Sequence, residues 1–256
     1  MGQDFFIKTS KDTGRALADL LMPRYCLVCG QRLSIHEKHL CIWCWGDFPF
    51  TRNWTETHNH MSNRFNELLI EKEPEGQTFQ YAAALFYYQE HNNYRKITQA
   101  LKYKADFSAG RHFGRLLGER LATSWGHDAD LVVPIPLHWT RKLSRGYNQA
   151  AVSAGALAEV LGIPMLPELL VRARKTKTQT LLDNEDKQKN VEGAFKVNPN
   201  LSRRTREVLG KTKHVILFDD VFTTGATMCS AYMALREILP ADIRISAVTL
   251  GCVQHF

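Results

Sequence analysis

Two carboxylates follow a run of apolar residues in the C-terminal part of this 256-residue chain. Residues 215–218 are typical of a buried strand, and Asp219 and Asp220 come directly after them. In an open α/β sheet, ligands bind beyond the carboxyl ends of the strands, so the two acids stand where a ligand is expected. Carboxylates in this position can accept hydrogen bonds from a ribose diol. The sequence therefore predicts that Asp219 and Asp220 bind a pentose.

The loop that follows has the composition of a phosphate-binding turn. Glycine allows close approach to the main chain, threonine hydroxyls add donors, and the N–H groups that open a helix favour an anion. The predicted phosphate-binding residues are Thr223, Thr224, Gly225, Ala226 and Thr227. No lysine follows the glycine as in a Walker loop, so a ribose 5-phosphate suits the loop better than a nucleoside triphosphate. A capped helix preceded by two acidic turn residues is the structural alternative.

Four of the six cysteines lie within 19 residues of one another. They form two C-x2-C pairs, Cys26 with Cys29 and Cys41 with Cys44, which is the spacing of a tetrahedral structural zinc site. Gly30 fits the end of such a knuckle, where the backbone often needs a positive φ. Disulfides are the competing interpretation, but no secretory signal is recognisable and a reducing cytosol keeps thiols free. We therefore predict zinc.

Two further features allow a nucleic-acid partner. Residues 201–213 carry five basic side chains against Glu207, and the net charge of +7 permits an anionic partner. A solvated surface is the alternative for this basic run. Aromatic residues lie close to the cysteines: Trp43, Trp45, Phe48, Phe50 and Trp54. They predict a small aromatic core beside the metal, with stacking on nucleic-acid bases as the alternative.

The rest of the sequence alternates between strand and helix patterns. Strands are expected over residues 81–88, 131–136, 214–218 and 243–250, and helices over 94–104, 107–125, 148–161 and 226–239. This alternation predicts an α/β fold, with a mainly parallel sheet flanked by helices on both faces. The polar stretch 62–76 contains Pro74 and Gly76 and predicts a boundary. It divides a zinc-binding segment and linker, 1–76, from a larger domain, 77–256.

The composition excludes several classes of protein. With 44% hydrophobic and 23% charged residues, the chain is unlike collagen, low-complexity or largely disordered sequences. No run reaches the ~18 apolar residues of a membrane span. Charged residues interrupt the N-terminal stretch, which lacks the apolar core of a signal peptide. A cytoplasmic protein is expected.

The motifs taken together resemble those of a known family. The sequence ILFDDVFTTGAT (216–227) is similar to the phosphoribosyl pyrophosphate (PRPP) motif of type I phosphoribosyltransferases. The chain as a whole resembles the ComF family of competence-associated, phosphoribosyltransferase-like proteins. Besides the four-cysteine segment, the resemblance covers LKYKADFSAGRHFG (101–114), VVPIPLHWTRKLSRGYNQA (132–150), KTKTQTLL (175–182) and NVEGAF (190–195).

The resemblance implies a type I phosphoribosyltransferase-like fold that binds PRPP with Mg²⁺. Asp219 and Asp220 would bind the ribose hydroxyls, one of them through Mg²⁺ or its water, and segment 172–190 would be a mobile hood over the site. The family usually has an arginine where Lys187 stands, which puts a bidentate contact there in doubt. The candidates for contact with the pyrophosphate are Arg141, Arg145, Asn148, Lys175 and Lys177.

Two functions are consistent with these observations. The first is a PRPP-binding protein that assists DNA uptake in natural transformation, with single-stranded DNA and the competence helicase as partners. The alternative is an active phosphoribosyltransferase that releases pyrophosphate from PRPP. No residue stands out as the base for an acceptor, so the catalytic residues and the acceptor are left unassigned.

Overall fold

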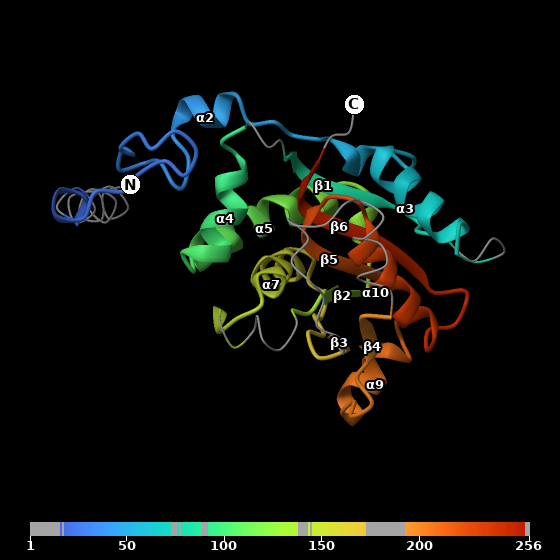
Figure 1. The fold of residues 1–256 in the computed structure, drawn as a ribbon. Helices are drawn as coiled ribbons and strands as arrows, with labels where there is room; N and C mark the ends of the chain where they lie inside the picture. The colour runs from blue at the N-terminus through green and yellow to red at the C-terminus, as the bar shows by residue number, and fades with distance from the viewer. Residues whose placement is uncertain are drawn as a thin grey trace, which may run out of the picture.

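A parallel four-stranded sheet forms the centre of the molecule, and helices cover both of its faces (Figure 1). The strands lie in the order β1–β6–β5–β2. Their bounds are Ala82–Tyr87 for β1, Leu131–Pro134 for β2, His214–Phe222 for β5 and Arg244–Cys252 for β6. This computed structural model describes residues 16, 18–72, 76, 78–88, 92–137, 143, 145–172 and 193–253.

The strands are buried on both faces because successive side chains enter two separate apolar cores. Val132 and Ile216 face the core covered by α4, α5 and α7. Leu131 and Val215 face the core covered by α3 and α10. The helix bounds are His60–Ile70 for α3, Arg95–Tyr103 for α4, Phe107–Ala122 for α5, Gln149–Leu161 for α7 and Ala226–Arg236 for α10. The predicted α/β fold, with a mainly parallel sheet flanked by helices, is confirmed.

Three details differ from the sequence-based expectation. β5 continues to Phe222, so Asp219 and Asp220 belong to the last part of the strand. The short helix α9 (Arg203–Leu209) lies within the basic run and was not predicted. The third difference is α3, which occupies most of residues 62–76, the polar stretch that we expected to form a boundary.

α3 forms because its first turn is capped and one of its faces is apolar. Asn59 Oδ1 accepts hydrogen bonds from the N–H groups of Met61 and Ser62, and Ser62 Oγ accepts one from the Asn59 N–H. Its buried face includes Phe65 and Leu68, which share a core with β1 and α10. The division predicted near residue 76 stays a prediction.

Residues 24–58, here called the cysteine segment, share a core with α4 and α5. The segment contains the short helix α2 (Ile42–Gly46) and the 3-10 turn η1 (Asn53–Thr55). Phe48 stacks on Phe113 of α5, with ring centroids 6.0 Å apart, and Trp45 lies at the same distance from that ring. The predicted aromatic core therefore exists, but Trp43 is 73% exposed and does not belong to it.

A second, antiparallel pair of strands lies beside α10. It consists of β3 (Leu170–Arg172) and β4 (Phe195–Val197). The hood predicted over 172–190 falls almost entirely outside the described residues. Among the residues that the structure describes, no helix is both long enough and apolar enough to cross a membrane.

Candidate functional site

The two predicted pentose-binding acids lie at the carboxyl end of β5, next to the end of β2. The Ile135 N–H donates a hydrogen bond to the Phe218 carbonyl oxygen at 2.8 Å, which extends the β2–β5 pairing up to the acids. On the other side, Asp219 is in register with Thr249 of β6. Both residues are of intermediate burial. They occupy the edge at which parallel sheets receive ligands.

A lysine that the sequence analysis did not single out completes this site. Lys102 Nζ, in the last turn of α4, lies 2.8 Å from Asp220 Oδ2, and the two side chains are 25% and 16% exposed. Nearby in the same helix, Thr98 and Leu101 are buried, whereas Lys104 is exposed. From this helical periodicity, the sequence could have predicted that Lys102, rather than Lys104, faces the sheet.

The environment of Asp219 strongly perturbs its ionisation. Desolvation and the neighbouring Asp220 carboxylate raise the pKa of Asp219 to about 7, although Lys102 and Arg172 of β3 act in the opposite direction. Asp219 Oδ1 accepts a hydrogen bond from the Asp220 N–H at 2.8 Å. The Asp219 carboxyl can therefore exchange a proton near neutral pH.

The turn from β5 into α10 depends on its glycine. Gly225 has φ 84°, a left-handed conformation that side-chain-bearing residues rarely adopt. A Cβ at this position would also lie 3.0–3.1 Å from Phe65, Leu68 and Phe222. α10 begins at Ala226, so its N-terminus follows the acid pair closely along the chain. Phosphate binding by residues 223–227 stays a prediction.

One candidate for contact with the pyrophosphate lies at the same sheet edge. Asn148 Nδ2 donates to the Ile135 carbonyl oxygen at 3.0 Å, while its Oδ1 is buried with no hydrogen-bond partner among the described residues. Arg145 instead places its guanidinium 5.5 Å from the centre of the Tyr103 ring. The remaining candidates, Arg141, Lys175 and Lys177, lie outside the described residues.

The four predicted zinc ligands come together. The Sγ atoms of Cys26, Cys29, Cys41 and Cys44 lie within 4.8 Å of one another, and those of Cys29 and Cys41 are 3.6 Å apart. Four thiolates about 2.3 Å from one zinc ion would be about 3.8 Å apart, which this arrangement matches. All four are free thiols rather than disulfides. The cluster could therefore hold a metal ion such as zinc.

Main-chain groups around the cluster stabilise a thiolate. Gly30 has φ 77°, as predicted, and its N–H donates to the Cys26 carbonyl oxygen at 3.0 Å. Burial acts to raise the pKa of Cys26, but main-chain N–H groups from Cys29, Cys41 and Val28 lower it to about 7. A thiolate at Cys26 is thus stabilised before any metal binds.

The same helix that carries Lys102 also contacts the cysteine segment. Tyr94, which precedes α4, donates from its hydroxyl to the Cys44 carbonyl oxygen at 2.8 Å. Lys96 Nζ donates to the Val28 carbonyl oxygen at 2.9 Å. One end of α4 therefore contacts the metal-ligating loops, and the other end contacts the acid pair.

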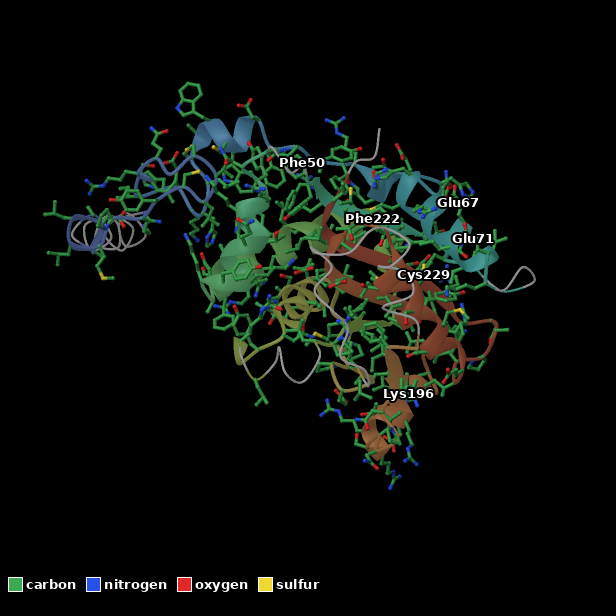
Figure 2. The ribbon with its side chains drawn as sticks, viewed as in Figure 1. Phe50, Glu67, Glu71, Lys196, Phe222 and Cys229 are labelled. Carbon is green, nitrogen blue, oxygen red and sulfur yellow. The ribbon has the colours of Figure 1, made fainter. Side chains whose placement is uncertain are left out.

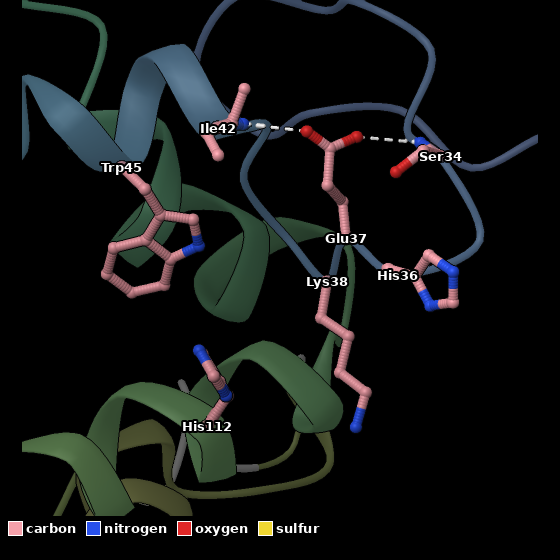
Figure 3. Close-up of a pocket in the computed structure, with 7 residues that line it drawn as sticks. All are labelled: Ser34, His36, Glu37, Lys38, Ile42, Trp45 and His112. Atoms are coloured by element: carbon pink, nitrogen blue, oxygen red, sulfur yellow. Dashed lines mark hydrogen bonds between the residues drawn. The ribbon is translucent and has the colours of Figure 1, made fainter.

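A separate cavity of about 660 Å³ lies between the cysteine segment and α5. Figure 3 shows Trp45 extending toward His112 of α5, while Lys38 passes to one side of the imidazole. Glu37 does not offer a free carboxylate there, because its two oxygens accept hydrogen bonds from the N–H groups of Ser34 and Ile42 at 2.7 Å. Burial lowers the pKa of His112 to about 4, so its imidazole is neutral at pH 7.

Basic side chains gather around α9 at one end of the molecule, where Figure 2 also places Lys196. Within the described part of this region, one ion pair offsets the charge, from Arg203 Nε to Glu207 Oε1 at 2.9 Å. The exposed basic residues are Lys196, Arg203, Arg204, Arg206, Lys211 and Lys213. This set, the α9 basic surface, carries a net positive charge.

We expect Asp219→Asn to stabilise the fold at pH 8 and to have little effect at pH 4. An acid whose pKa is raised on folding binds its proton more tightly in the native state, so stability falls as pH rises from about 4 to about 7. The asparagine variant escapes this loss and should be about 2–4 kcal/mol more stable at pH 8.

Urea unfolding at several pH values measures this difference. The exposed Asp242→Asn is the matched control and should leave the curve unchanged. If the free energy of unfolding depended on pH equally in wild type and Asp219→Asn, the Asp219 carboxyl would be well solvated in the native state.

No family model matches the chain. The chain is 30% identical to Competence protein F of Haemophilus influenzae over 153 residues, which are 58% of this chain and 64% of that protein. It is 31% identical to the DNA utilization protein YhgH of Escherichia coli K12 over 109 residues, 42% of this chain and 44% of that protein. The match to YhgH of Salmonella typhimurium has the same length at 32% identity. The matched regions thus span about half to two thirds of these relatives.

Proposed function

On the premise that the chain is a ComF-family protein, which its relatives support, we propose that it binds PRPP or a related phosphorylated pentose and assists DNA uptake. The single observation that carries the pentose site is the meeting of an acid pair and a glycine-dependent helix start at the carboxyl edge of β5. The carboxylates can accept hydrogen bonds from a ribose diol, and the N-terminus of a helix favours binding of a phosphate.

Two metal ions belong to the proposal. Zinc would be held by the four cysteines and would stabilise the cysteine segment. Mg²⁺ would accompany the pyrophosphate of PRPP, whose charge needs a divalent partner. Asp219 and Asp220 would orient the ribose. Asn148, at the same sheet edge, would contact the pyrophosphate of the ligand.

The role in DNA uptake is supported by the names of the relatives and by surface charge. Competence protein F and the DNA utilization protein YhgH are named for competence and for DNA use. The α9 basic surface could contact phosphates of single-stranded DNA. Exposed Ile42 and Trp43 on α2 could contact a protein partner, for which we propose the competence helicase.

Two paired variants test the pentose and DNA sites independently. The double variant Asp219→Asn/Asp220→Asn should lose binding of PRPP in calorimetry with Mg²⁺ present, but should retain binding of single-stranded DNA. The pair Arg204→Glu/Arg206→Glu should weaken a labelled single strand about tenfold or more and retain PRPP. Wild-type affinity for the strand should also fall steeply with salt, by about tenfold or more between 50 and 200 mM for several phosphate contacts.

Several results would contradict the proposal. Unaltered PRPP affinity in the acid-pair variant would show that Asp219 and Asp220 do not bind the ligand. An affinity for single-stranded DNA that does not change with salt would show that the α9 basic surface does not bind it. Magnesium-dependent release of pyrophosphate in the presence of bases or amines would favour the alternative, an active phosphoribosyltransferase.

A further inference from the structure

The acid pair already has a cation supplied by the protein. Lys102 Nζ is 2.8 Å from Asp220 Oδ2, a distance typical of a charge-assisted hydrogen bond. Two adjacent carboxylates repel each other, and a positive charge paired with one of them reduces that repulsion. In many proteins a divalent cation has this role, but here a lysine occupies the position.

Lys102 is held in place from several directions. Ile97 of α4 is buried in the core that the helix shares with the sheet, and Leu101 is buried next to Gly110 of α5. The Tyr147 hydroxyl donates to the Leu101 carbonyl oxygen, which fixes the turn that carries Lys102. Only a quarter of the Lys102 side chain is exposed, so its ammonium has little freedom to move into solvent.

The charges at this edge are already close to balance. Asp220 pairs with the ammonium of Lys102, and the charges of Lys102 and of Arg172 in β3 both act on Asp219. Burial acts to lower the pKa of Lys102, but Asp220 outweighs this effect and raises it, so the ammonium stays protonated. A divalent cation bound to the carboxylates would lie against this ammonium and would be repelled.

We propose that Lys102 is a built-in counter-ion that takes the position of a divalent cation at Asp219 and Asp220. The acid pair then binds no Mg²⁺ of its own. Any Mg²⁺ that the protein uses is bound through the phosphates of the ligand. This last consequence rests on the proposed function, whereas the exclusion of a cation from the carboxylates does not.

A titration with Mn²⁺ alone, followed by electron paramagnetic resonance on the zinc-loaded protein, tests the proposal. Lys102→Met removes the charge while keeping most of the side-chain length, and should tighten Mn²⁺ binding about tenfold or more relative to wild type. Lys104→Met, an exposed lysine of the same helix end, is the matched control and should leave Mn²⁺ binding unchanged. Adding Asp220→Asn to Lys102→Met should abolish the new site.

The wild-type protein gives a second test that does not depend on the folding of the Lys102 variant. Wild type and Asp220→Asn should bind Mn²⁺ equally weakly. A Mn²⁺ site in wild type that disappears in Asp220→Asn would overturn the proposal, as would a folded Lys102→Met without tighter Mn²⁺ binding. Calorimetry with PRPP and Mg²⁺ separates the two claims. Failure of wild type to bind PRPP, together with a gain of Mn²⁺ in Lys102→Met, would reject the proposed function but retain the counter-ion.

Discussion

Loss of metal from the four-cysteine cluster is expected to unfold the cysteine segment and to destabilise the whole fold. In Cys41→Ser the cluster loses a buried ligand, and the remaining thiols cannot complete a tetrahedral site. Structural zinc contributes directly to folding, so we expect a loss of about 5 kcal/mol or more. Elemental analysis should find one zinc per chain in wild type and none in the variant, and trypsin should cleave the variant at Arg32 and Lys38.

The effect should extend beyond the cysteine segment because that segment shares a core with the sheet. Phe48 packs on Phe113 and forms an edge-on contact with Tyr94, and both partners belong to the larger body of the chain. Thermal unfolding should therefore show a lower midpoint for the complete protein rather than a small separate transition.

Cys229→Ser is the control for the cysteine chemistry. Cys229 is buried on α10, away from the cluster, and its Sγ contacts the Phe65 carbonyl oxygen at 3.6 Å. Its substitution should leave the zinc content at one per chain. A full zinc load in Cys41→Ser, or a metal-free wild type that resists trypsin equally, would contradict a structural metal at this site.

Sequence alone predicted the sites whose parts are adjacent along the chain. The four cysteines lie in two local turns, so their spacing is enough to bring the thiols together. The acid pair and Gly225 lie in one continuous strand, turn and helix, and their order predicted their placement at the sheet edge. Contiguous motifs need no knowledge of how distant elements pack.

The features that the sequence did not predict depend on distant packing. Lys102 belongs to α4, far from Asp220 in the chain, and a lysine on an amphipathic helix is ordinarily a solvent-facing residue. α3 has a polar composition, and its stability comes from the cap at Asn59 and from Phe65 against α10. The cap at Asn59 is local to the chain, but the packing of Phe65 exists only once the sheet is assembled, so composition marked a boundary where a helix forms.

Gly114→Ala is expected to disrupt the packing of α5 against α7, two helices that cover one face of the sheet. α5 and α7 approach each other so closely at Gly114 that an added Cβ would overlap the Ser153 carbonyl oxygen and lie 3.0 Å from the Ser153 Cα. The obstructing atoms belong to a helix backbone, which cannot rotate away as a side chain can. The helices must separate, and the core around Phe113 and Leu157 must loosen.

This separation should cost about 2–4 kcal/mol in the free energy of urea unfolding, with little change in zinc content. Gly155→Ala is the matched control on α7, where an added Cβ would meet Met165 at an ordinary 3.6 Å. Because alanine favours a helix more than glycine does, that variant should be neutral or stabilised by up to about 1 kcal/mol. Similar stability changes in both variants would mean that α5 and α7 do not pack at this distance, and that the close approach at Gly114 does not limit the fold.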